Sequence, residues 1–172
     1  MAALNPQVIG KEMPHGFAGC YARQPDMIVE TRPAGGEAPI PFGAPLVYDA
    51  TKPAVVAAGA TFAAANFVGV AGCEIKSALS YLDQQAGQYA PGDAVSVFQR
   101  GSINVRAYGT PALGGAVYVR TAASDTYTTE PVGAFTATNE SGDTVQLTNC
   151  QWGGPADANG IAELVILTRA NA

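Results

Sequence analysis

The side chains that could carry out chemistry in this sequence are few and widely spaced. His15 is the only histidine, so a Ser-His-Asp or Cys-His site would have to use it, although it lies in a segment rich in Pro and Gly. Cys20, Cys73 and Cys150 lack the close spacing of zinc ligands, and we interpret them as small apolar side chains. The sequence therefore predicts no metal site and no nucleophile–histidine pair.

Other ligand-binding motifs are present only as fragments. Asp157, Asn159 and Gly160 have the spacing found at the start of a calcium loop, but the acidic continuation of that loop is missing. The glycine pairs at 35–36, 114–115 and 153–154 lack the context of a phosphate-binding loop. Most carboxylates flank predicted turns, although a pair across two strands could still form a hydrolase site. We predict neither a cofactor nor an enzymatic activity.

The charge of the chain favours a protein partner. Charged residues make up only 13% of the sequence, about half the share that is usual in globular domains. A surface with so little charge is typical of a protein that buries part of it against another protein. The formal net charge is −5, and the lysines and arginines form no cluster. This distribution excludes a nucleic-acid binder, which needs basic residues to neutralise phosphates.

Membrane insertion and secretion are not expected. Residues 54–72 are apolar, but they are rich in Ala and Gly and are interrupted by Thr61 and Asn66, so their transfer into a bilayer would be poor. The N-terminus lacks the positively charged and then apolar pattern of a secretory signal. We expect a protein that is made in a reducing cytoplasm.

Alternation of apolar and polar residues predicts strands through most of the chain. Residues 94–100 and 103–106 alternate with a period of two, and the Gly101-Ser102 step between them predicts a hairpin. Further strands are expected at 46–48, 55–56, 67–70, 116–120, 132–138, 144–148 and 162–168, while residues 75–82 could be a strand or a helical turn. With 20 Gly and 12 Pro, the pattern predicts an all-β fold: a single antiparallel β-sandwich or barrel.

The first 38 residues differ from the rest, because Pro and Gly interrupt them and only residues 27–31 could form a short strand. They nevertheless contain more apolar side chains than a free linker needs. Two interpretations stay open: an arm that orders against a neighbouring subunit, or a loop that wraps its own domain. We expect an extended N-terminal arm at residues 1–38 and a β domain at residues 39–172.

Candidate partner-binding residues occur in both regions. Arg100, at the tip of the predicted hairpin, could contact a partner as a charge at the rim of an interface. Trp152, the only tryptophan, is either a core side chain or an interface anchor. The full set of candidates is Val8, Ile9, Met13, Phe17, Tyr21, Tyr81, Tyr89, Arg100 and Trp152.

Several stretches of the chain resemble one family of phage proteins. They are YLDQQAGQYAPGDAVSVFQRGSINV at 81–105, GTPALGGAVYVR at 109–120 and LTNCQWGGPADANGIAELVILTR at 147–169, with IPFGAPLVY and NFVGVAG further upstream. Taken together, in this order and spacing, these stretches are similar to the structural cement or head decoration proteins of tailed bacteriophages. The similarity extends from about residue 39 to the end of the chain and is less clear before it.

The resemblance implies a specific location and partner. Family members have an all-β, sandwich or jelly-roll-like domain that forms oligomers on the capsid, so a homodimer or a homotrimer is expected. The partner would be the major capsid protein, bound on the outer surface of the head, where the decoration protein strengthens the shell. The protein would be made in the host cytoplasm and incorporated into the virion, with no nucleic-acid or membrane partner.

A different class of function remains compatible with a β fold, because fold does not determine function. The alternative is a small β-barrel enzyme, such as a nucleotide hydrolase, or a glycan-binding β-sandwich. A hydrolase would need a cluster of acids, and none stands out in the sequence. A lectin would need exposed aromatic rings beside carboxylates or amides, and Tyr81 with Asp83, or Tyr89, could serve in that way.

Overall fold

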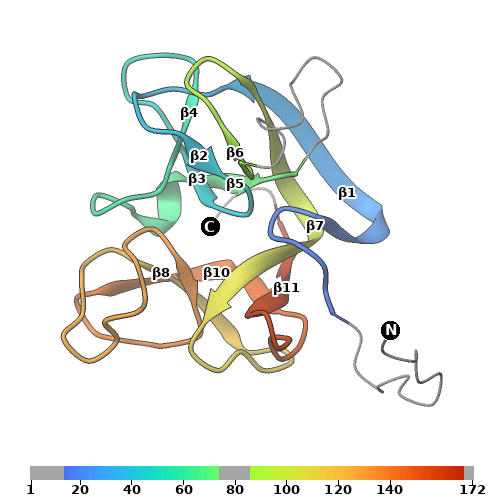
Figure 1. Cartoon of the computed structure of the whole chain (residues 1–172), viewed down its shortest axis with the longest axis vertical. Helices are drawn as coiled ribbons and strands as arrows, with labels where there is room; N and C mark the ends of the chain where they lie inside the picture. The colour runs from blue at the N-terminus through green and yellow to red at the C-terminus, as the bar shows by residue number, and fades with distance from the viewer. Residues whose placement is uncertain (1–13, 74–85, 169–172) are drawn as a thin grey trace, which may run out of the picture.

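The computed structural model describes residues 14–73 and 86–168, which form an all-β protein, as predicted (Figure 1). A single turn of 3-10 helix, Ala64–Asn66, is the only helical element in these two ranges. No helix in the same ranges is long and apolar enough to span a membrane. The strands are β1 (Tyr21–Pro33), β2 (Ile40–Pro41), β3 (Pro45–Tyr48), β4 (Val55–Ala57), β5 (Phe67–Ala71), β6 (Gln88–Tyr89), β7 (Ala94–Tyr108), β8 (Ala116–Arg120), β9 (Phe135–Thr136), β10 (Thr144–Trp152) and β11 (Ile161–Ile166).

A closed ring of strands forms the C-terminal half of the fold. Strand β7 pairs with β11, β11 with β10, β10 with β8, β8 with β9, and β9 with β7. All of these pairings are antiparallel except the short parallel contact between β7 and β9. We call this ring the barrel. Because its strands close on one another, their hydrogen-bonding edges are satisfied within the chain.

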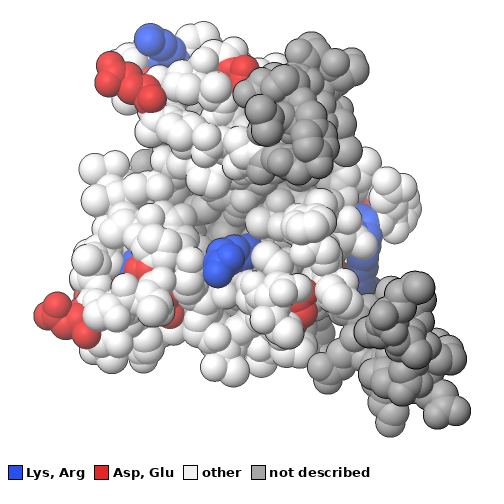
Figure 2. Space-filling model, viewed as in Figure 1, with Lys and Arg blue, Asp and Glu red and all other residues white. Residues whose placement is uncertain are grey.

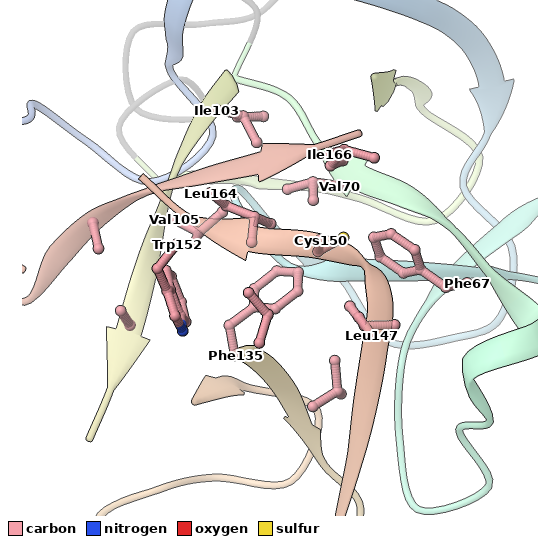
Figure 3. Packing of buried hydrophobic residues seen from close by; sticks show 14 of the residues in the cluster. Phe67, Val70, Ile103, Val105, Phe135, Leu147, Cys150, Trp152, Leu164 and Ile166 are labelled. Atoms are coloured by element: carbon pink, nitrogen blue, oxygen red, sulfur yellow. The ribbon is translucent and has the colours of Figure 1, made fainter. Parts of the chain in front are cut away.

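Apolar side chains from every strand of the barrel fill its interior (Figure 3). Trp152 and Leu147 of β10 and Phe135 of β9 are each at most 1% exposed. Phe67 and Val70 of β5 join the same cluster from outside the ring. Burial of so much apolar surface is the main source of stability in a fold of this kind.

The strands that precede the barrel form what we call the N-terminal lobe. Strand β5 pairs with β7 and β3, and β3 also pairs with β4, while β2 and β6 form a separate two-stranded sheet. A second cluster of buried residues fills this lobe, with Leu46, Val55 and Val97 all 0% exposed. Figure 1 shows β7 running from this lobe, in the upper part of the view, to the barrel below.

The predicted hairpin at Gly101-Ser102 is wrong, because β7 continues through both residues. The side-chain alternation does change at this point. Before Gly101 the even-numbered Phe98 belongs to the barrel cluster, and after it the odd-numbered Ile103 does. Gly101 has φ +105°, and a Cβ at this position would lie 2.4 Å from the carbonyl oxygen of Asp26. A left-handed residue that shifts the alternation is typical of a β-bulge rather than a turn. The strand was also predicted to be half-buried, whereas most residues on both faces of β7 are buried.

The segment predicted as an arm contains a long strand. Only residues 27–31 were expected to be extended, but β1 runs from Tyr21 to Pro33 and pairs with β7 on both sides of Gly101. Its pairing is interrupted between Arg23 and Ile28, where the register shifts. The boundary between an arm and a β domain at residue 38 stays a prediction, as does the jelly-roll-like arrangement.

Candidate partner-binding surface

The structure separates the predicted partner-binding residues into exposed and buried groups. Phe17 is 79% exposed and precedes β1, so its ring is free to contact another protein. Tyr21 is half-buried, and its ring packs against Phe98 with 5.2 Å between ring centroids. Arg100 lies in the middle of β7 rather than at a hairpin tip, and its Nε is 3.2 Å from a carboxylate oxygen of Asp26.

Tyr89 and Trp152 are core residues, which agrees with the core interpretation of Trp152 and corrects the assignment of Tyr89 as a partner contact. Tyr89 is 2% exposed, and its hydroxyl donates a hydrogen bond to the carbonyl oxygen of Gly72. Trp152 is 0% exposed and lies inside the barrel, where its main-chain N–H donates to the Gly115 carbonyl at 3.0 Å (Figure 3). A partner cannot reach either ring without opening the core. Val8, Ile9, Met13 and Tyr81 lie outside the described residues.

The three cysteines were predicted to be small apolar side chains, and Cys150 is buried whereas Cys20 and Cys73 are only half-buried. Cys150 is buried in the barrel cluster, where burial raises the pKa of its thiol to about 12. Cys20 and Cys73 are far apart in sequence but neighbours in space, because the N–H of Cys73 donates to Gly19. Burial, and secondarily the adjacent Cys20, raise the pKa of Cys73 to about 11. Such thiols are protonated and unreactive near neutral pH.

His15 and the fragment of a calcium loop meet in a shallow cleft of about 410 Å³ beside β11. The Asp157 carboxylate accepts hydrogen bonds from the main-chain N–H groups of Ile161, Asn159 and His15 at 2.9–3.0 Å. These hydrogen bonds, of which the one from the Ile161 N–H contributes most, hold the pKa of the Asp157 carboxyl below its ordinary value. The contact uses the main chain of His15 and not its imidazole. In the described part of the chain, no three His, Cys, Asp or Glu side chains gather as metal ligands.

A groove between the N-terminal lobe and the barrel was not anticipated from the sequence. Its volume is about 380 Å³, and we call it the interlobe groove. A neighbouring hollow of about 490 Å³ shares Ala18 and Arg106 with it. Among the described residues, Arg106 is the one charged residue that lines either hollow. The groove is lined by Ala18, residues 41–45, residues 57–58, Arg106, Tyr108 and residues 131–135.

Close backbone contacts build the walls of the interlobe groove. Gly133, on the barrel side, approaches the N-terminal lobe so closely that a Cβ would lie 2.2 Å from the carbonyl oxygen of Ala58. Gly43 similarly faces Ala18, because a Cβ on Gly43 would lie 2.8 Å from the Cβ of Ala18. Only glycine permits such close approach of two backbones. These contacts fix the spacing of the two walls, so the groove is formed before any partner binds.

Arg106 differs from the other described arginines, because no carboxylate of residues 14–73 or 86–168 pairs with it. Arg23, Arg32, Arg100 and Arg120 each form an ion pair with a carboxylate of the same chain. Arg106 is exposed and forms no ion pair with any residue in 14–73 or 86–168. Its guanidinium lies over the Tyr108 ring, 5.8 Å from the centroid. Figure 2 shows the same face as Figure 1 to be largely uncharged, with a basic group near its centre.

These features define an all-β protein with a surface groove between two packed parts, and comparison with known proteins assigns its family. The family model for "Structural cement protein (E217 gp24/Pam3 gp6)" matches residues 5–167. The chain belongs to this family of phage structural cement proteins, and its role is that of a capsid cement or decoration protein. Comparison with curated proteins gave no match.

A solved structure has the same fold. A chain from the capsid of Myoviridae phage XM1 superimposes with a TM-score of 0.68 at 16% sequence identity, and the alignment covers 96% of this chain and 98% of that one. At this identity the similarity concerns the fold alone. The family match over residues 5–167 confirms the resemblance to phage cement proteins found in the sequence.

Proposed function

We propose that this protein binds the outer surface of a phage head and stabilises the shell of major capsid protein. The observation that supports the proposal most directly is the family match over residues 5–167. The low content of charged residues, 13% of the chain, fits a protein whose surface is partly covered in the virion. The negative net charge of −5 fits a position outside the shell rather than against packaged DNA.

Stabilisation would follow from mass action. A protein that binds the assembled shell and not its separated subunits lowers the free energy of the shell by the free energy of binding. Many equivalent sites on the lattice multiply this effect. We propose a non-enzymatic role that depends on binding alone, with synthesis in the host cytoplasm before assembly.

We further propose that the protein acts as a closed homo-oligomer, either a dimer or a trimer, since a capsid lattice offers symmetric sites. The predicted arm at residues 1–38 would make such contacts through the part that precedes β1, since β1 pairs with β7 of its own chain. Residues 39–172 would form the β domain with a jelly-roll-like arrangement. The exposed ring of Phe17 supports a contact in the part of the arm that precedes β1.

Co-sedimentation with undecorated, expanded heads of the matching phage tests the proposal. We expect saturable binding, and we expect decorated heads to withstand heat or low salt better than bare heads. Mass spectrometry of purified virions should find the protein in stoichiometric amounts. Absence of binding to intact expanded heads would contradict the proposal, and the enzyme or glycan-binding alternatives would then be tested with nucleotide and glycan panels.

A further inference from the structure

We propose that the interlobe groove binds a segment of the major capsid protein in which apolar side chains flank a carboxylate, and that Arg106 pairs with this carboxylate. The inference rests on the proposed function and identifies the surface and the chemistry through which it would act. It depends on the unpaired charge, the orientation of the guanidinium and the apolar walls of the groove.

The charge of Arg106, which pairs with no carboxylate in the described ranges, sets the first requirement for a partner. A protein that covered the groove with apolar atoms alone would remove the guanidinium from water without compensation, at a large cost in free energy. A partner that brings a carboxylate avoids this cost and gains charge-assisted hydrogen bonds. Charge complementarity therefore favours an acidic occupant at this position.

The orientation of the guanidinium suits a carboxylate. Arg106 lies over the ring of Tyr108, at 5.8 Å from its centroid, within the range of cation–π attraction. An arginine held against an aromatic ring loses little further side-chain entropy when it binds, and its planar donors can engage both oxygens of a carboxylate. A neutral acceptor would form a weaker hydrogen bond with the guanidinium and would leave its positive charge without a counter-charge.

Apolar residues on both sides of Arg106 set the second requirement. Val132 lines the groove on the barrel side and is 41% exposed. Phe17 lines the adjoining hollow and is 79% exposed. A segment that places its carboxylate on Arg106 can therefore bury an apolar side chain in each of the two hollows. A hydrophobic contact area around a central arginine is a common arrangement at binding hot spots.

The capsid protein is a better source of the carboxylate than a second copy of this chain. Most carboxylates in the described ranges already accept hydrogen bonds or ion pairs from their own chain, so the described part of a second copy has few to offer. These engaged carboxylates are Asp26, Glu30, Asp49, Asp93, Glu130, Glu140, Asp157 and Glu163. An acidic segment of the shell protein would pair with Arg106 without breaking any of these contacts.

Charge reversal in the groove tests the proposal with a matched control. Arg106→Glu and Lys52→Glu change the net charge equally, and Lys52 is exposed on a loop that does not line the groove. Binding to expanded heads is measured by co-sedimentation for both variants and the wild type, after circular dichroism has established that each is folded. We expect Arg106→Glu to weaken binding at least tenfold, and Lys52→Glu by less than threefold. We also expect the wild-type affinity to fall more steeply with salt than that of Arg106→Ala.

A conservative variant identifies the occupant directly. Arg106→Lys keeps a positive charge and provides an amine that a carbodiimide can couple to a carboxylate in contact with it. We expect a covalent link between Lys at this position and an acidic peptide of the major capsid protein, found by mass spectrometry of decorated heads. A link to a second copy of this chain, or loss of oligomers in Arg106→Glu, would overturn the assignment to the capsid protein.

The outcomes for the wild type separate this inference from the proposed function. If the wild type does not sediment with heads, the proposed function fails, and the assignment of the groove fails with it. If the wild type binds and Arg106→Glu binds equally well, the proposed function stands and the assignment of the groove is wrong.

Discussion

The guanidinium of Arg120 lies 2.7 Å from a carboxylate oxygen of Glu130, and the two side chains are only 0% and 4% exposed. Arg120 is the last residue of β8, and Glu130 belongs to the loop that leads to β9. A second carboxylate, that of Glu140, accepts a hydrogen bond from Arg120 Nη1 at 2.8 Å. Burial would lower the pKa of Arg120, but the bonds to Glu140 and Glu130 outweigh burial and raise it. The loops before and after β9 are therefore both fastened to the barrel by one buried cation.

Removal of Glu130 is expected to destabilise the protein strongly. Glu130→Ala would leave Arg120 buried without its closest partner, and loss of one member of a buried ion pair typically costs about 3–5 kcal/mol. Asp26→Ala is the control, because the Arg100–Asp26 pair is exposed by 43% and 70% and such pairs contribute about 0–1 kcal/mol. Urea denaturation measures both free energies of unfolding. Equal effects would show that Arg120 finds other partners in the variant.

The same network makes the free energy of unfolding depend on pH in the acidic range. Hydrogen bonds from Arg120 and then Ser124 lower the pKa of Glu140 from its ordinary value of 4.5. A carboxyl with a lowered pKa in the folded state stabilises the fold above its ordinary pKa, and this contribution is lost as pH falls through the lowered value. Glu140→Gln should therefore be less stable than the wild type at neutral pH, with a smaller loss of stability on acidification.

Thermal unfolding between about pH 7 and pH 3 measures this difference. The control is Glu37→Gln, an exposed carboxylate outside the network, which should leave the acid-dependent loss unchanged. Parallel pH profiles for Glu140→Gln and the wild type would contradict the role of Glu140 in acid sensitivity.

The bulge in β7 is expected to require glycine. Gly101→Ala would add a Cβ 2.4 Å from the Asp26 carbonyl oxygen, in addition to the strain of φ +105°. Gly142→Ala is the matched control, since Gly142 has φ +93° but nothing within 4 Å of a Cβ. Strain alone costs about 1–2 kcal/mol, and steric overlap should add on the order of 1–3 kcal/mol in Gly101→Ala. Equal melting temperatures for the two variants would mean that β1 can move away from the added Cβ without a loss of stability.

Truncation should distinguish the segment before β1 from β1 itself. Removal of residues 1–13 retains every contact among residues 14–73 and 86–168, so we expect cooperative unfolding within a few degrees of the full-length protein. Removal of residues 1–34 deletes β1 and exposes the edge of β7 along Ala94–Arg100, so cooperative unfolding should be lost. Calorimetry measures both. A cooperative transition in the longer truncation would show that β1 is dispensable to the barrel.

Local sequence patterns were sufficient to predict the all-β class and the approximate position of many strands. Period-two alternation and nearby Gly and Pro depend on neighbours in the chain, and they placed strands at β3, β5, β8 and β11 close to their observed bounds. The break in alternation at Gly101 was also detected correctly. Its interpretation as a hairpin was wrong, because a turn and a bulge differ in long-range pairing, here with β1 and β11.

The partner-binding surface required the tertiary structure. Trp152 and Tyr89 belong to residue types that are common at interfaces, and only packing shows that both rings are buried. Arg106 has no distinguishing feature in the sequence, where it is one of several scattered basic residues. Its proposed role depends on having no carboxylate partner within the described ranges and on walls supplied by two lobes, and spacing along the chain determines neither. The sequence thus determined the fold class and the family, whereas the closed barrel, the bulge and the groove around Arg106 follow from contacts between distant segments.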